Sequence, residues 1–182
     1  MELKAQLLKP YTEEQKIDFL AVQNQQLYYE IIETDIALEA WGLSDEEQLQ
    51  QTKQNKYNEA LVGAKSYIEN EAVYQFDENN SIEATDGNIG KMTAYALGFQ
   101  TGTIQQVYWT SKEDNVLILN AEDVLRILEG LGQIQGVVWN LKFVAYKNAI
   151  ESAQSIEDVL SIVIDYSLPT TEEISEVEQN GD

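Results

Sequence analysis

One short polar segment of this chain has the residue spacing of a metal site. Side chains with oxygen ligands occupy alternate positions there: Asp77, Asn79, Ser81, Glu83 and Thr85. Such alternation is typical of the calcium-binding loop of an EF-hand, which also requires Gly at its sixth position and a bidentate Glu at its twelfth. Here those two positions hold Ile82 and Asn88. We therefore interpret the segment as the turn of a β-hairpin and expect neither a metal ion nor another cofactor.

Other residue types that carry out enzyme chemistry are absent or are explained by helix starts. The chain contains no Cys and no His, which excludes thiolate or imidazole zinc sites, cysteine nucleophiles and the Ser-His-Asp triad. Adjacent carboxylates occur at Glu13/Glu14, Asp45/Glu46 and Glu122/Asp123. Each pair lies in the predicted first turn of a helix, where the helix dipole favours acidic side chains. We therefore predict no catalytic residues and no enzymatic activity, and a carboxylate-metal enzyme is the least favoured hypothesis.

The main compositional feature is negative charge. The chain has 11 basic and 32 acidic residues, for a formal net charge of −21. Such a chain repels the phosphates of nucleic acids and anionic membranes, so neither is an expected partner. Two interpretations remain: an acidic protein that stays dispersed at high concentration, or a DNA mimic that occupies a basic protein. The acidic residues are scattered and form no ladders, which favours the first interpretation.

No segment has the character of a membrane span or of a secretory signal. No run approaches the roughly 20 apolar residues that a spanning helix needs. The first residues, Met-Glu-Leu-Lys, lack a basic region followed by an apolar one. We therefore expect synthesis in a cytoplasm.

The elements that would position functional residues begin with a small N-terminal unit, residues 1–43. The sequence predicts a strand over 2–8, a helix that starts at the capping box Thr12–Gln15, and a strand over 27–33. The predicted inner helix face consists of Ile17, Leu20 and Ala21. This strand–helix–strand unit has few apolar residues and leaves strand edges unpaired. We expect it to dock on another protein, on a second copy or on the main domain through Leu8, Tyr11, Phe19, Tyr29, Ile31 and Trp41.

A long linker helix is predicted over residues 44–71. Ser44 and Glu47 form its capping box. Its first half is almost wholly polar, which is typical of a solvated spacer. Its second half carries an apolar stripe: Tyr57, Leu61, Ala64 and Ile68. We expect this second half to dock on the main domain.

The main domain, residues 72–168, is predicted to be α+β. A small antiparallel β-meander around 73–83 and 104–119 is covered by helices over 86–98, 121–131, 138–153 and 155–166. The expected breaks between the second and third helices are Gly130, Gly132 and Gly136. An aromatic stripe typical of a core runs along the third helix: Trp139, Phe143, Tyr146, Ile150 and Ala153.

The last predicted helix is capped by Ser155 and Asp158 and ends at Pro169. Its predicted inner face consists of Ile156, Val159, Leu160, Val163 and Ile164. Residues 169–182 hold five acidic residues and no basic one, so we expect a disordered acidic tail.

Several local motifs follow the order of a known family. They include Trp109-Thr110, Asp114-Asn115 and Ala121-Glu122-Asp123 within the stretch from about Asn55 to Ile164. This stretch resembles an uncharacterised domain family found in small proteins encoded beside the tail-fibre genes of bacteriophages and prophages. Segments 6–15 (QLLKPYTEEQ) and 33–42 (ETDIALEAWG) resemble the opening of such proteins from phages of low-GC Gram-positive bacteria. Together the two resemblances cover nearly all of the chain.

The resemblance implies structural rather than catalytic roles for the matching residues. Those expected to fix the hairpin and the following helix start are Trp109, Asp114, Asn115, Asn120 and Asp123. The implied function is a non-enzymatic tail protein, either a virion component near the tail fibre or baseplate or a fibre-assembly chaperone. Its partners would be other tail proteins or further copies of itself, in the virion tail or in the host cytoplasm during assembly. An acidic cytoplasmic inhibitor that mimics DNA is the alternative.

Overall fold

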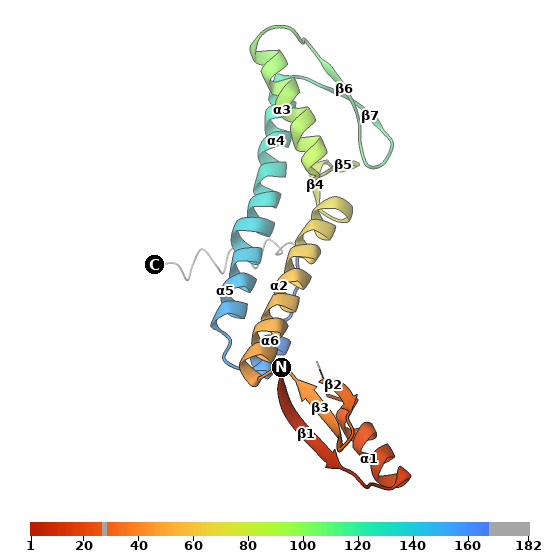
Figure 1. The fold of residues 1–182 in the computed structure, drawn as a ribbon. Helices are drawn as coiled ribbons and strands as arrows, with labels where there is room; N and C mark the ends of the chain where they lie inside the picture. The colour runs from red at the N-terminus through yellow and green to blue at the C-terminus, as the bar shows by residue number, and fades with distance from the viewer. Residues whose placement is uncertain (27–28, 168–182) are drawn as a thin grey trace. The chain divides into compact units, whose positions relative to one another are not determined.

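The computed structural model describes residues 1–26 and 29–167, which divide into two compact units (Figure 1). Unit 1 contains residues 1–56 and 153–161, and unit 2 contains residues 57–152 and the chain from 162 onward. The fold is α+β with small antiparallel sheets, which confirms the predicted class. The tail 169–182 and the start of the predicted strand 27–33 lie outside the described residues.

Unit 1 is built on a three-stranded sheet that the sequence predicted only in part. Its strands are β1 (Glu2–Leu8), β2 (Tyr29–Glu33) and β3 (Ala37–Gly42), in the order β1-β3-β2. The predicted strand–helix–strand unit is therefore wrong in lacking β3, which pairs with both of the other strands. The segment ALEAWG is rich in residues that strands disfavour. Pairing on both sides, and not local propensity, makes it a strand.

Helix α1 (Glu13–Gln23) starts at the predicted capping box. Thr12 Oγ1 accepts a hydrogen bond from the Gln15 amide at 3.2 Å, and the Gln15 side chain accepts one from the Thr12 amide at 2.9 Å. The predicted inner face is wrong at Ile17, which is 63% exposed, and at Ala21, which is also exposed. The half-buried positions are Lys16, Phe19, Leu20 and Gln23. Lys16 reaches Glu33 of β2, and this contact turns Ile17 outward.

Helix α2 (Asp45–Asn70) confirms the helix predicted over 44–71 and belongs in part to each unit. Its capping box is also confirmed, because Ser44 and Glu47 exchange hydrogen bonds through their amides and side chains. In its second half Ala64 and Ile68 are buried in the core of unit 2. The polar first half begins in unit 1 and carries the buried Thr52.

Helix α6 (Ile156–Ser161) is shorter than the predicted helix 155–166. The Ser155–Asp158 cap is confirmed, and Val159 is buried as predicted. Leu160 and Val163 are exposed, however, so the predicted inner face is wrong at both positions. The chain leaves the helix to bury Tyr166, whose hydroxyl donates to the Ala60 carbonyl at 2.8 Å.

The strands of unit 2 form two separate hairpins and not one meander, which corrects the prediction. One hairpin is β4 (Val73–Asp77) with β5 (Asn80–Glu83), and the other is β6 (Val107–Thr110) with β7 (Val116–Leu119). The second turn is joined to the first hairpin by one backbone hydrogen bond, from the Lys112 amide to the Ser81 carbonyl at 3.0 Å, and by the Glu113 carboxylate, which accepts from Ser81. These few bonds join the two hairpins without the backbone ladder of a continuous sheet.

The helices of unit 2 are α3 (Asp86–Gln100), α4 (Ala121–Gly136), the π-helical η1 (Val137–Phe143) and α5 (Val144–Ser152). The predicted glycine breaks are wrong, because helical structure continues from 121 to 152 without interruption. Gly130 serves packing instead. A Cβ at this position would lie 2.2 Å from Cδ2 of Tyr74. The glycine therefore lets an aromatic ring of β4 approach the helix backbone.

The core of unit 2 lies among α2, both hairpins, α3 and α4. Its fully buried large side chains are Ile82, Met92, Leu119, Val124, Ile127, Leu131 and Val138. The aromatic stripe of the third predicted helix packs against this core: Trp139, Phe143 and Tyr146 are each half-buried. Ile150 is buried as predicted.

Candidate functional site

One face of the unit 1 sheet, which we call the open face, carries exposed apolar side chains. Residues opposite each other on antiparallel strands share a face, as do residues two apart along one strand. The register places the following pairs on the open face: Leu3–Trp41, Ile32–Glu39 and Leu8–Ala37. Leu3 is 44% exposed, Leu8 61% and Ile32 40%. These three side chains are therefore available to a partner.

Helix α1 covers the opposite face of the same sheet. This covered face carries Leu38 and Ala40 of β3, which are 3% and 0% exposed. Glu33 pairs with Leu38 and so shares this face. Lys16 of α1 donates to Glu33 at 2.9 Å, which fixes the helix on that side. Unit 1 thus has one face protected by its own helix and one that its helix leaves uncovered.

The Glu33 carboxylate ties together three segments of unit 1. It accepts a hydrogen bond from the Tyr11 hydroxyl at 2.7 Å and pairs with the ammonium groups of Lys16 at 2.9 Å and Lys9 at 3.1 Å. The hydrogen bond from Lys16, followed by those from Tyr11 and Lys9, lowers the pKa of Glu33 to about 2. The cluster uses the acid as a structural anchor, since all of its donors serve to hold the carboxylate in its charged form.

The structure divides the six predicted docking residues between different surroundings. Leu8 and Trp41 lie on the open face, where the Trp41 indole N–H donates to Glu39 at 2.8 Å. Tyr29 and Ile31 lie on the covered face, and the ring of Tyr29 fills the space above Gly42. The remaining two positions are half-buried beside the anchor and on α1: Tyr11 and Phe19.

Sequence reasoning missed Leu3 and Ile32 as members of the open face. Strict alternation along β1 would place Leu3 with Ala5 and Leu7 on the covered face. The register shift between Leu3 and Ala5 instead sets Leu3 opposite Trp41, so alternation was no signal for it. Ile32 had no local signal either. Its position depends on its pairing with Glu39 of β3, the strand that the sequence did not predict.

Both outer strands of this sheet present a backbone edge. β1 and β2 flank β3, and among residues 1–26 and 29–167 neither pairs with a further strand. An edge strand exposes unpaired amide and carbonyl groups, which are a template for pairing with another chain. The open face and the two edges together form the candidate docking surface.

In unit 2 the predicted structural residues of the second hairpin occupy its turn. Asp114 has a φ of 62°, a left-handed conformation that Asp and Asn tolerate better than most residues. The Ser111 amide donates to the Asn115 carbonyl at 2.9 Å, and the Asn115 side chain donates to Asn80 of β5 at 3.0 Å. Trp109 packs edge-to-face on Tyr95 of α3. These contacts position the hairpin.

Glu113 is a turn residue that the sequence did not single out. It accepts from the Ser81 amide at 2.8 Å and from the Ser81 hydroxyl at 2.5 Å. These bonds lower the pKa of Glu113 to about 2. Ser81 is one of the residues with metal-like spacing in the polar segment 77–85, and its hydroxyl joins the two hairpins. Only the three-dimensional structure brings Glu113 to it.

The carboxylate of Asp77 is engaged in its own turn. It accepts from the Asn79 amide at 2.8 Å and from the Asn80 side chain at 2.9 Å. Over the described residues, no group of three or more acidic side chains is arranged to hold a metal ion. The segment with metal-like spacing is therefore organised as a hairpin turn.

The remaining predicted structural residues lie on the long helical segment of unit 2. Asn120 is the N-cap of α4, and Asp123 completes a reciprocal capping box with it. Trp139 packs edge-to-face on Phe143 at a centroid distance of 5.5 Å. The Tyr146 hydroxyl donates to the Asp165 carbonyl at 2.5 Å. All of these side chains hold the fold.

Comparison with known proteins identifies no relative. No family model, no curated protein and no solved structure matches this chain. Across the part of the chain that the structure describes, no helix combines the length and apolarity needed to cross a membrane.

Proposed function

We propose that this protein is a non-enzymatic docking protein that attaches to another protein chain through the sheet of unit 1. The observation that carries the proposal is the open face, with exposed Leu3, Leu8 and Ile32 between two edge strands that pair with no further strand in the described part of the chain. A partner strand added to β1 or β2 would gain backbone hydrogen bonds, and the apolar side chains would select its sequence.

The energetics of unit 1 support a docking role. Its buried apolar side chains in the sheet are small in number: Ala37, Leu38 and Ala40. Helix α1 contains no fully buried residue. Such a unit gains little from its own core, so covering the open face would add a large fraction of its apolar burial.

The setting that we propose is the tail of a bacteriophage or prophage particle. The support is the resemblance carried by Trp109-Thr110, Asp114-Asn115 and the 121–123 segment, with that of the N-terminal segments 6–15 and 33–42. In this setting the partner is another tail protein, and the chain acts either as a component near the fibre or baseplate or as a fibre-assembly chaperone.

The test is incorporation of full-length variants into tail particles of the phage that encodes the chain. Ile32→Asp places a charge on the open face, whereas Val22→Asp places the same charge on an exposed position of α1 in the same unit. We expect Ile32→Asp to reduce the amount of this protein in particles, or bound to the fibre, by at least about tenfold, because the carboxylate would be buried unpaired.

Mass spectrometry of purified particles and of complexes with the fibre protein gives the readout. Val22→Asp should behave as the parent chain does. Equal incorporation of both variants would overturn the docking role of the open face. Absence of the parent chain from particles and from fibre complexes alike would overturn the tail setting.

A further inference from the structure

One end of unit 2 carries almost no charge although the chain as a whole is strongly acidic. Charged residues make up 24% of the sequence, and the formal net charge is −21. Yet segments 92–111 and 115–121 contain no Asp, Glu, Lys or Arg. They form the C-terminal half of α3, the connection to β6, both strands of the second hairpin and the first residue of α4, just before the acidic Glu122 and Asp123. We call this region the neutral surface.

The outer face of the second hairpin contributes exposed apolar side chains to the neutral surface. Tyr108 pairs with Ile118, and Val116 lies on the same side of the hairpin, while the other side buries Val107 and Leu119. Tyr108 is 62% exposed, Ile118 64% and Val116 68%. A two-stranded hairpin with an apolar side chain on its outer face at three positions is suited to contact a second protein surface.

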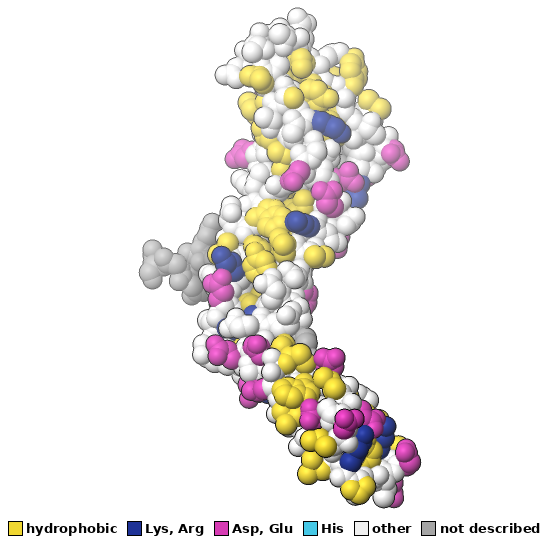
Figure 2. Space-filling view, viewed as in Figure 1, with side chains coloured by type: hydrophobic (Ala, Val, Ile, Leu, Met, Phe, Trp, Pro, Cys, Tyr) yellow, Lys and Arg dark blue, Asp and Glu magenta, His cyan; other side chains and the backbone are white. Residues whose placement is uncertain are grey.

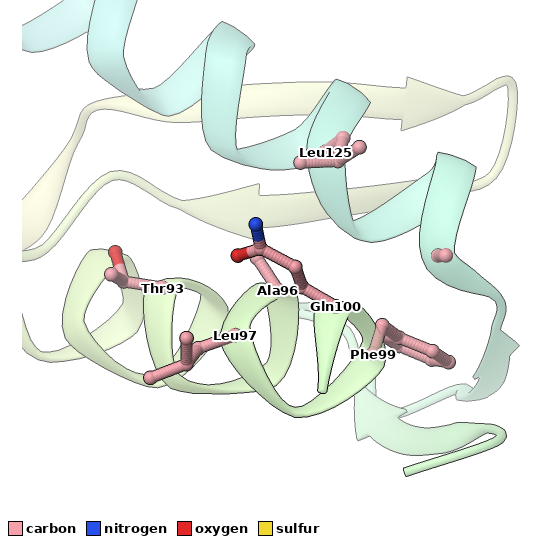
Figure 3. A pocket seen from close by; sticks show the side chains of 7 residues that line it. Thr93, Ala96, Leu97, Phe99, Gln100 and Leu125 are labelled. Atoms are coloured by element: carbon pink, nitrogen blue, oxygen red, sulfur yellow. The ribbon is translucent and has the colours of Figure 1, made fainter. Parts of the chain in front are cut away.

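The neutral surface also includes a groove between α3 and α4, to which Leu125 contributes (Figure 3). Its volume is about 670 Å³. None of its lining residues is charged: Thr93, Ala96, Leu97, Phe99, Gln100, Ala121 and Leu125. Leu97 and Leu125 are 59% and 58% exposed on its walls. On the face seen in Figure 2, the end formed by α3 and the second hairpin shows mainly hydrophobic and uncharged side chains.

We propose that the neutral surface binds a second copy of this chain. The argument is electrostatic. Two chains of −21 repel each other, so copies associate at the least cost where neither presents a charge. A basic partner would gain more from surface that carries acidic residues than from a region that carries no charged residue at all. The neutral surface therefore fits a partner as acidic as the chain itself.

This inference goes beyond the proposed function, because it concerns unit 2 and a different partner. The two proposals also fail separately. A charge on the open face of unit 1 is expected to affect particle incorporation, whereas a charge on the neutral surface is expected to affect self-association of the purified chain.

The first test is the salt dependence of self-association, measured by sedimentation velocity on the full-length chain. Because salt screens the repulsion between like-charged copies, the association should strengthen as NaCl rises from 20 to roughly 500 mM. A monomer at high micromolar concentration and at every salt concentration would overturn the proposal. Association that weakens with salt would also overturn it, since ionic contacts would then hold the copies together.

The second test uses two leucines on the continuous helical segment that begins with α4. Leu125 lines the groove and Leu141 lies outside the neutral surface, yet they are 58% and 57% exposed. Leu125→Glu should weaken self-association by at least about tenfold, because each copy would bury an unpaired carboxylate. Leu141→Glu adds the same charge and should leave the dissociation constant unchanged. An equal effect of the two substitutions would overturn the assignment.

A third test locates the contact directly and uses the absence of cysteine from the sequence. Ile118→Cys introduces a single thiol on the outer face of the hairpin, and Val62→Cys introduces one at an equally exposed position of α2. With a short bismaleimide, the first variant should form covalent dimers and the second should not. Cross-linking of Val62→Cys alone would place the contact elsewhere and overturn the proposal. Circular dichroism of each variant confirms that the fold is retained.

Discussion

The two units of this protein both expose apolar side chains beside short antiparallel strands, but they differ in what stabilises them. Unit 2 has a contiguous core that includes seven large, fully buried side chains. Unit 1 buries few apolar side chains and relies on ion pairs that involve Lys4, Lys9 and Lys16. In Figure 2 the face of unit 1 turned to the viewer shows hydrophobic side chains among acidic and basic ones. A small unit held by charges can be reorganised by a partner, whereas a unit with a packed core serves as a rigid support.

The largest expected effect is a cavity in the core of unit 2. Ile127 is 0% exposed, so Ile127→Ala should cost about 2–5 kcal/mol of the free energy of unfolding. Chemical denaturation followed by tryptophan fluorescence measures it, since Trp109 and Trp139 both lie in unit 2. The exposed neighbour Leu125 is the control, and Leu125→Ala should cost less than about 0.5 kcal/mol. Equal losses would mean that unit 2 lacks the core described above.

A smaller effect on stability is expected from substituting two nearby glycines of unit 2, and its sign should differ between them. A Cβ on Gly130 would meet the Tyr74 ring at 2.2 Å, whereas a Cβ on Gly132 would meet nothing within 4 Å. Overpacking of about 1–3 kcal/mol should outweigh the helix propensity gained by Gly130→Ala. Gly132→Ala should instead stabilise the protein by about 0.5–1 kcal/mol. Thermal denaturation of the Gly130→Ala and Gly132→Ala variants measures both effects. If both substitutions raise the thermal midpoint, the packing of Tyr74 on Gly130 is contradicted.

Acid should weaken the contacts of the Glu33 carboxylate in unit 1 and of the Glu113 carboxylate in unit 2. The loosening should be easier to detect in unit 1. Glu33 and Glu113 each have a pKa near 2 in the folded protein, against an ordinary value of 4.5. A lowered pKa means that the stabilisation is complete above about 4.5 and is lost as the pH falls from there toward 2. Trp41 fluorescence and hydrogen exchange should therefore report loosening of unit 1 in this range.

The matching variants are Glu33→Gln and Glu113→Gln. Glu33→Gln should remove the acid dependence of unit 1 and lower its stability at neutral pH, while unit 2 keeps the response that Glu113 supplies. If Glu33→Gln leaves the acid response of Trp41 fluorescence intact, another carboxylate controls unit 1.

The smallest effect on unit 2 is expected from removal of residues 1–43. Its core residues lie between Ala64 and Tyr166, so none is lost. A chain that begins at Ser44 should keep the thermal midpoint of unit 2 within about 2 °C, since distant and independent parts contribute additively. Calorimetry measures the midpoint, and the shortened chain should no longer enter tail particles. Loss of the unit 2 transition would show that residues 1–43 are part of its core.

Local signals in the sequence predicted helix starts well. The caps at Thr12, Ser44, Asn120 and Ser155 each depend on hydrogen bonds between residues at most four apart, so the sequence contains all of the information. The hairpin turns at 77–80 and 111–115 are local for the same reason. These features account for the α+β class that the sequence predicted.

Contacts between distant segments account for what the sequence did not predict. Strand β3 exists because β1 and β2 pair with it, Gly130 stays helical because Tyr74 packs on it, and α6 ends early because Tyr166 turns back to α2. The sequence predicted the candidate docking surface only in part for the same reason. Leu3 and Ile32 join Leu8 and Trp41 only through their register with β3.

The π-helical segment η1 constrains how the length of this chain can change. Each residue of a helix advances the side-chain direction by roughly 100°, so deletion of Asn140 would rotate α5 by that angle relative to α4. Tyr146 would then leave Tyr166 and the Asp165 carbonyl, which it contacts at present. We expect a single-residue deletion there to be tolerated far less well than a conservative substitution at the same position. The π-helical segment thus sets the rotation of α5 about the helix axis relative to α4, so that the two ends of one long helical segment face different neighbours.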